Sequence, residues 1–118
     1  MGNFEKFIRK GFRRAREPRI TLNKAGIITF NASCVDEYVK DHGFAELYYD
    51  AQEKRIGIKL LNEQTEHLFK IQRSRNKRVV LVTARTFVEY YKIMPKETKS
   101  YPVRWDARED MLIIDLRQ

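Results

Sequence analysis

The sequence predicts a mainly β protein with short helices (an α+β fold), built from two diverged copies of one strand-strand-helix-strand-strand unit. Two blocks of self-similarity predict the duplication. Residues 28–40 align with residues 80–92, and residues 49–60 align with residues 105–116, in the same order and with nearly the same shift. Because self-similarity at such a period marks repeated structural units, we expect the two copies to share one ββαββ fold.

The duplication divides the chain of 118 residues into three parts. These are a basic N-terminal arm (1–17), a first repeat (18–61) and a second repeat (68–117). A repeat of roughly 40 residues is below the size that usually folds unaided. We therefore expect the repeats to pack as one globular domain, either on each other or on another chain.

Each repeat is expected to hold four strands. In the first repeat the strands cover residues 19–23, 27–30, 45–49 and 55–60, with the turn Asn23-Lys24-Ala25-Gly26 between the first two. In the second repeat they cover residues 68–73, 79–82, 101–105 and 111–116. Apolar residues alternate with others, most clearly at 56–60 and 112–116, which is typical of strands with one buried face.

A short helix follows the second strand of each repeat. Asn31 and Thr83 are good N-cap residues at the two strand-to-helix corners. Helical spacing predicts a buried face made by Cys34, Val35 and Tyr38 in the first helix, and by Phe87, Tyr90 and Tyr91 in the second. Gly43 suits the left-handed conformation in which many helices end, so we expect it at the end of the first helix.

The charge of the chain is concentrated in two segments. Residues 1–24 contain eight Lys or Arg against two Glu, and residues 70–78 contain five Lys or Arg and no acid. These excesses outweigh the net charge of +8 of the whole chain. Solubility could be served equally well by dispersed charge, so clustering favours a polyanionic partner such as nucleic acid.

The order of elements resembles a known family. The turn at 23–26, the strand at 27–30, the short helix and the hairpin of 45–49 with 55–60 together resemble the AbrB/MazE/SpoVT swapped-hairpin domain. The resemblance covers residues 18–61 well and 68–117 loosely. It implies a β-barrel in which the two repeats intertwine as a pseudo-dimer, and binding of DNA by basic residues near the first strands and their turn.

The candidate nucleic-acid-binding residues come from three segments. The resemblance places Arg19 and Lys24 on DNA in the first repeat, and Arg73, Arg75, Lys77 and Arg78 in the second. Arg and Lys neutralise phosphates, while Ser74 and Asn76 in the same turn could bond to phosphates or base edges. The alternative is an exposed hairpin tip that tolerates charge. The arm adds Arg13, Arg14 and Arg16.

The N-terminal arm is open to three interpretations. Phe4, Phe7, Ile8 and Phe12 stand at helical spacing, and the remaining face is cationic. The arm could bind nucleic acid, dock its aromatic side chains on the folded domain, or lie on an anionic membrane surface. Docking and nucleic-acid binding are compatible with each other.

Nothing in the sequence predicts a catalytic, metal or cofactor site. Cys34 is the only cysteine, which excludes internal disulfides and thiolate cages, and it is expected in the core. His42 and His67 lack neighbouring ligands at metal-binding spacing. No glycine-rich phosphate loop or nucleophile elbow occurs. Most of the strand aromatics, Tyr48, Tyr49, Tyr101 and Trp105, are expected in the core, although outward ones could stack on bases.

The sequence thus predicts a non-enzymatic, cytoplasmic DNA-binding protein, of the transcription-regulator type, without a cofactor. The absence of a long apolar run and of a secretory leader excludes a membrane span and favours the reducing cytoplasm. Two alternatives stay open: a single-stranded nucleic-acid binder, or a protein-interaction module of antitoxin-like or phage- or plasmid-borne kind. The expected assembly is a monomeric pseudo-dimer or a homodimer.

Overall fold

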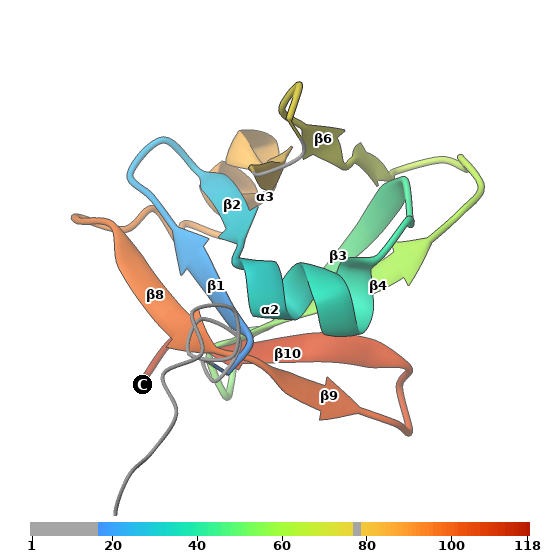
Figure 1. The fold of residues 1–118 in the computed structure, drawn as a ribbon. Helices are drawn as coiled ribbons and strands as arrows, with labels where there is room; N and C mark the ends of the chain where they lie inside the picture. The colour runs from blue at the N-terminus through green and yellow to red at the C-terminus, as the bar shows by residue number, and fades with distance from the viewer. Residues whose placement is uncertain (1–16, 77–78) are drawn as a thin grey trace, which may run out of the picture.

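The computed structural model of the chain describes residues 17–76 and 79–118. This part is mainly β with a few short helices, so the predicted class is confirmed (Figure 1). Its elements are β1 (Arg19–Leu22), β2 (Ile27–Phe30), α2 (Ala32–Cys34), η1 (Val35–Val39), β3 (Phe44–Asp50), β4 (Arg55–Leu61), β5 (Phe69–Lys70), β6 (Gln72–Arg73), β7 (Val80–Thr83), α3 (Arg85–Tyr90), β8 (Lys99–Pro102), β9 (Arg104–Asp106) and β10 (Met111–Asp115).

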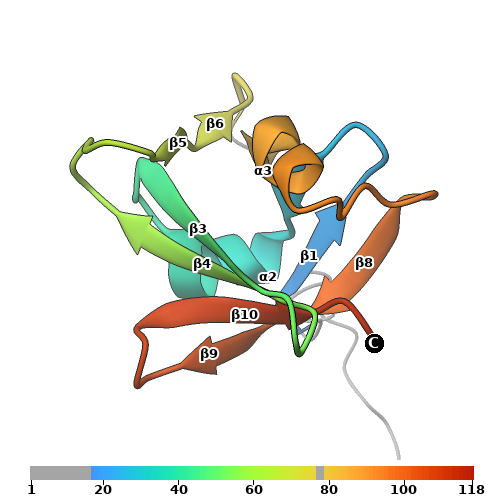
Figure 2. The ribbon, with the colours of Figure 1, turned by 180° about the vertical axis from the view of Figure 1, so that it is seen from behind.

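The strands form two antiparallel sheets. Sheet A has the order β6-β7-β2-β1-β8, and sheet B has the order β5-β3-β4-β10-β9. The centre of each sheet joins a strand from residues 18–61 to one from residues 68–117, namely β2 to β7 and β4 to β10. The first helix, made of α2 and η1, and the second helix, α3, lie on opposite sides of the molecule (Figures 1 and 2).

The core lies between the sheets. Sheet A buries residues at alternate positions, including Ile20, Leu22, Ile28 and Phe30, and sheet B buries Ile56, Ile58, Leu112 and Ile114. The predicted inward positions are confirmed at Ile56, Ile58, Leu112 and Ile114, whereas the burial of Ile113 shows that the centre of β10 is covered on both faces. Since each buried aliphatic side chain contributes about 1.5–3 kcal/mol, this shared core is the main force that holds the sheets together.

One predicted helix cap is confirmed and one is wrong. The Asn31 Oδ1 accepts a hydrogen bond from the Cys34 backbone N–H at 2.9 Å and so caps the first helix. Thr83 caps nothing, because it is the last residue of β7 and its Oγ1 accepts from the Gln72 side chain at 3.3 Å. Ala84 takes the N-cap position of α3, and its N–H donates to the Gly26 carbonyl.

The predicted end of the first helix is also wrong. The helix ends at Val39, and Lys40 rather than Gly43 takes a positive φ, of 46°. Gly43 is already engaged in the β ladder: its N–H donates to the Leu61 carbonyl and its carbonyl accepts from the Ile71 N–H. Cross-strand pairing therefore decides the backbone conformation there.

Two strands expected as continuous are divided. The segment 68–73 splits at Ile71 into β5, which pairs with β3, and β6, which pairs with β7. The segment 101–105 similarly divides at Val103 into β8 and β9, and only β9 pairs with β10. In both places one stretch of chain contributes to both sheets, which local sequence patterns cannot indicate.

The predicted buried face of the second helix is confirmed at Phe87 and wrong at Tyr90. Phe87 and Val88 are buried, whereas the Tyr90 side chain is 77% exposed. Val88 faces Gly26 in the turn between β1 and β2, so the approach of that turn sets which side of α3 is covered. Within the described ranges, no helix has the length and apolar character needed to cross a membrane.

Candidate nucleic-acid interface

The outer face of sheet A is the surface that bears on the predicted nucleic-acid site. Ile20 and Leu22 of β1 point into the core, so Arg19 and Thr21 point outward. By the same alternation, Thr29 of β2 points outward. This face carries short polar side chains at its centre.

A continuous row of outward residues crosses all five strands of sheet A. The register places Gln72 beside Leu81, Leu81 beside Thr29, Thr29 beside Thr21, and Thr21 beside Ser100. Four of these five side chains offer a hydroxyl or an amide. Such groups hydrogen-bond to phosphate oxygens and to base edges, so the row suits a polar, anionic ligand.

Acidic residues are segregated between the two sheets. No Asp or Glu occurs in the five strands of sheet A. The strands of sheet B contain four, which are Glu46, Asp50, Asp106 and Asp115. Sheet A is thus the side of the described chain that repels a polyanion least.

Arg19 is the first residue of β1 and lies at one end of this face. Hydrogen bonds hold its guanidinium against Ser100 of the neighbouring strand β8. Its Nε donates to the Ser100 Oγ at 2.8 Å, and its Nη2 donates to the Ser100 carbonyl at 3.0 Å. Its Nη1 pairs with the Glu17 carboxylate at 3.2 Å. The guanidinium is therefore oriented in advance, with 37% of the side chain exposed.

Lys24 occupies the turn between β1 and β2. The Asn23 Oδ1 accepts from the backbone N–H groups of Ala25 and Ile27, both at 2.9 Å, which fixes the turn. Gly26 follows with a φ of +83°, in close contact with α3. The Lys24 side chain is exposed at this tip.

Arg73 has a structural role. Its Nη2 donates to the backbone carbonyls of Lys40 and His42, at 2.8 and 2.9 Å. These carbonyls follow the end of η1, where helical carbonyls lack partners within the helix. Arg73 thus ties the first helix to β6, a contact across more than thirty residues that the charge pattern alone could not reveal.

The turn after Arg73 is built like the turn at Asn23. The Ser74 Oγ accepts from the Val79 N–H at 3.1 Å, and the Ser74 N–H donates to the Val79 carbonyl at 2.9 Å. Arg75 is exposed in this turn. The other predicted binding residues, Arg13, Arg14, Arg16, Lys77 and Arg78, lie outside the described residues.

The four described candidates do not form one cluster. Phe30 pairs with both Ile20 and Val80, so Arg19 and the turn holding Arg75 lie at the same end of the sheet A strands, three strands apart. Lys24 lies at the opposite strand ends, since Ile27 pairs with Thr83. Arg73 points to the first helix.

Sequence reasoning missed the polar row of Thr21, Thr29, Gln72 and Ser100. Two signals could have found it. The outward positions of the predicted strands at 19–23 and 27–30 hold Thr, and those strands contain no acid. Clustered positive charge marks only the segments beside the sheet, and the centre of the sheet is neutral.

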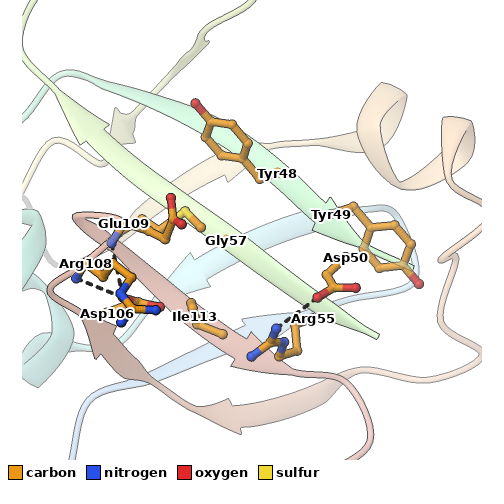
Figure 3. Close-up of a pocket in the computed structure, with 10 residues that line it drawn as sticks. Tyr48, Tyr49, Asp50, Arg55, Gly57, Asp106, Arg108, Glu109 and Ile113 are labelled. Carbon is orange, nitrogen blue, oxygen red and sulfur yellow. Dashed lines mark hydrogen bonds and ion pairs between the residues drawn. The ribbon is translucent and has the colours of Figure 1, made fainter. Parts of the chain in front are cut away.

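Sheet B carries a shallow, open hollow of about 300 Å³ on its outer face (Figure 3). Tyr48, Gly57 and Ile113 lie along it, and carboxylate–guanidinium groups flank it. The Arg55 Nη2 pairs with Asp50 at 2.9 Å, which holds the pKa of that carboxyl below its usual range. A paired, ionised carboxylate is a weak proton acceptor, so Asp50 is a poor candidate for a general base.

The strand aromatics divide between the core and the surface. Tyr101 is buried and Tyr49 packs against the core, as predicted for most of them. Tyr48 and Trp105 are 42% and 40% exposed. On α3, Tyr90 and the 42%-exposed Tyr91 border an open hollow of about 530 Å³ that is rich in aromatic and aliphatic side chains.

Cys34 is a core residue, as predicted. It is fully buried, and burial raises the pKa of its thiol to about 12. A thiol with so high a pKa does not act as a nucleophile at neutral pH. Across residues 17–76 and 79–118, no group of three or more His, Cys, Asp or Glu side chains is placed to hold a metal ion.

Searches of protein-family models, curated proteins and solved structures find no match to this chain.

Proposed function

We propose that this chain is a duplex DNA-binding protein of the swapped-hairpin kind, acting as a transcriptional regulator. The observation that carries the proposal is the outer face of sheet A, which is free of acids in its strands, lined by hydroxyl and amide groups and flanked by Arg19 and Arg75. Hydroxyl and amide groups would contact the duplex there, while cations at the strand ends neutralise phosphates.

The pairing of sheet A supports a pseudo-dimer of two repeats. Ile28 pairs with Val82 and Phe30 pairs with Val80. In the sequence alignment Ile28 corresponds to Val80 and Phe30 corresponds to Val82. Exchanging the two repeats therefore converts each of these pairs into the other, as a two-fold axis between β2 and β7 requires.

The pairing of sheet B has the same property. Ile58 pairs with Leu112 and Ile56 pairs with Ile114. Ile56 corresponds to Leu112 and Ile58 corresponds to Ile114 in the alignment, so these pairs also exchange. Two independent central pairings obey one symmetry, as expected if the chain encloses a dimer-like interface between two repeats.

The divided strands support closure of the sheets into a barrel. The chain passes from β8 in sheet A to β9 in sheet B across Val103, and from β5 in sheet B to β6 in sheet A across Ile71. Each crossing would join one edge of sheet A to one edge of sheet B. A closed barrel leaves no sheet edge open to aggregation, and the repeats could not separate without losing both sheets.

The test is a salt titration of binding to duplex DNA, with single-stranded DNA and RNA in parallel. If six to eight cations engage phosphates, log K should fall with log salt with a slope of roughly −5 to −7. The duplex should be preferred over both competitors. A slope near zero, or equal affinity for unrelated polyanions such as heparin, would exclude the proposal.

A single-stranded nucleic acid is the second candidate, because Tyr90 and Tyr91 are exposed beside a hollow whose lining includes no residue of sheet A. Base stacking on an exposed aromatic contributes about 1–3 kcal/mol per base. Replacing Tyr90 with Ala should lower affinity for a single strand about tenfold if this candidate is correct. It should leave duplex binding unchanged if sheet A is the interface.

A further inference from the structure

A stacked pair of aromatic rings, the half-buried Tyr38 and the exposed Trp105, lies between the first helix and β9. The rings of Tyr38 and Trp105 stack with centroids 5.7 Å apart and an interplanar angle of 11°. Tyr38 belongs to η1, and Trp105 is the middle residue of β9. Trp105 is 40% exposed, although it points to the inner side of sheet B, where its neighbour Leu112 is fully buried.

The exposure of Trp105 follows from its place at an edge. Strand β9 is the last strand of sheet B, so nothing in that sheet covers its far side. A large apolar ring at such a margin is costly to leave in water. Among the described residues, Tyr38 covers one side of the ring and a further apolar group would suit the other.

The N-terminal segment enters the described fold beside this pair. The Asn31 Nδ2 donates to the Glu17 carbonyl at 3.1 Å, and the Val103 N–H donates to the Pro18 carbonyl at 3.2 Å. Val103 lies two positions before Trp105 in the sequence. Glu17 and Pro18 therefore lie next to the corner that begins the first helix and next to the chain that leads into β9.

We propose that residues 4–12 dock their apolar side chains on the Tyr38–Trp105 pair. Phe4, Phe7, Ile8 and Phe12 supply apolar groups at the spacing of one helical face. Phe12 is five positions before Glu17, a span of about 7.5 Å in a helix and about 17 Å when extended. Either span covers a ring that lies beside the point of entry.

The charge of the surface matches the charge of this segment. Asp36 and Glu37 are exposed in the first turn of η1, and Asp41 is exposed just after the helix ends. Residues 4–12 contain Lys6, Arg9 and Lys10 against a single acid. These carboxylates attract a cationic segment, and the exposed Lys40 and Arg104 reduce that attraction, so the point at which the chain enters the fold is the main argument for the arm as the occupant.

The second helix provides a comparison. Tyr91 lies next to α3 and packs on Tyr49 of β3 with ring centroids 5.0 Å apart. At that site the residues leading into β5, which are His67, Leu68 and Phe69, line the hollow beside Tyr90 and Tyr91. Under the proposed repeat symmetry, the chain that leads into β1 would take the corresponding position at Tyr38 and Trp105.

Trp105 is the only tryptophan of the chain, so its fluorescence reports directly on this contact. In the full chain at low micromolar concentration we expect a blue-shifted emission and slow quenching by acrylamide. The variant F4S/F7S/F12S should shift the emission to the red by several nanometres and raise the quenching constant at least twofold. The matched control V79S/Y90S/M94S, which removes three exposed apolar side chains elsewhere, should leave both unchanged.

Three results would overturn the proposal. One is an emission and a quenching constant that F4S/F7S/F12S does not alter while circular dichroism shows an intact fold. Another is an emission that shifts to the blue only as protein concentration rises, which would make a second copy the occupant. The third is a blue shift of the intact chain only on adding vesicles of anionic phospholipid. Because these measurements contain no nucleic acid, their outcome is independent of the proposed DNA binding.

Discussion

Arg19 and Ser100 are 81 positions apart in the sequence, yet the guanidinium of Arg19 donates to both the side chain and the backbone of Ser100. The contact joins the first strand of the N-terminal half to β8 of the C-terminal half, on the outer face of sheet A. The same arginine is a candidate phosphate contact. Its position on the proposed interface therefore depends on both halves of the chain.

An acid on the polar row should weaken duplex binding without unfolding the protein. Thr29→Glu adds one negative charge at the centre of sheet A, where like-charge repulsion of phosphate should lower duplex affinity about tenfold or more. The control Gln52→Glu adds the same charge to the exposed turn between β3 and β4. Fluorescence anisotropy with a labelled duplex measures both. Equal losses in the two variants would mean that only net charge matters.

Arg73 and Arg75 should behave differently although they are neighbours in one basic segment. Arg73→Ala leaves the Lys40 and His42 carbonyls without their partner, so we expect a loss of about 1–3 kcal/mol in the free energy of unfolding. Arg75→Ala removes an exposed side chain and should change that free energy by less than about 0.5 kcal/mol.

Duplex affinity should distinguish the same two variants. Arg75→Ala should weaken binding and reduce the salt slope by about one. Urea denaturation and salt-titrated binding together check the pair. Equal unfolding free energies for the two variants would show that the contacts of Arg73 contribute nothing to stability.

Two glycines provide a matched test of the turn that packs on α3. At Gly26 the φ is +83°, and an added Cβ would lie 2.8 Å from the Arg85 Cα and 2.8 Å from a methyl of Val88. Gly26→Ala should therefore destabilise the fold by at least about 1 kcal/mol. At Gly43 nothing lies within 4 Å of an added Cβ, so Gly43→Ala should be nearly neutral. Thermal unfolding of both variants measures this difference in stability. Similar melting temperatures for the two variants would contradict the turn geometry.

The buried thiol should make stability depend on pH in the alkaline range. Burial raises the pKa of Cys34 from 9.0 to about 12, so between these values the folded state keeps a proton that the unfolded state loses. Ionisation then favours the unfolded chain, and the contribution that is complete below pH 9 declines as pH rises. The free energy of unfolding should fall more steeply from pH 8 to 10 in the native chain than in Cys34→Ala.

The reactivity of the same thiol provides a second measurement. At pH 8 a disulfide reagent such as Ellman's should modify Cys34 only in denaturant, because the side chain is fully buried when folded. Rapid modification of the folded protein would place the thiol at the surface and contradict its position in the core.

Several features of this protein were predictable from the sequence because their causes are local. Alternation of apolar residues at 56–60 and 112–116 reflects the pleat of a strand, and the buried Ile56, Ile58, Leu112 and Ile114 confirm it. Asn31 caps the first helix through a bond to a residue three positions away. The burial of Cys34 follows from its apolar neighbours on one helical face.

The tertiary structure alone decided what depends on partners distant in the sequence. Gly43 is held by hydrogen bonds to Leu61 and Ile71, so the positive φ that ends the first helix occurs at Lys40. Thr83 pairs with Ile27 in the sheet, so the N-cap of α3 is Ala84. Trp105 is exposed because it lies on the edge strand of sheet B. Arg73 donates to two carbonyls at the end of the first helix instead of adding to the basic turn. Local patterns carry propensity and periodicity, whereas these outcomes depend on which strands lie side by side.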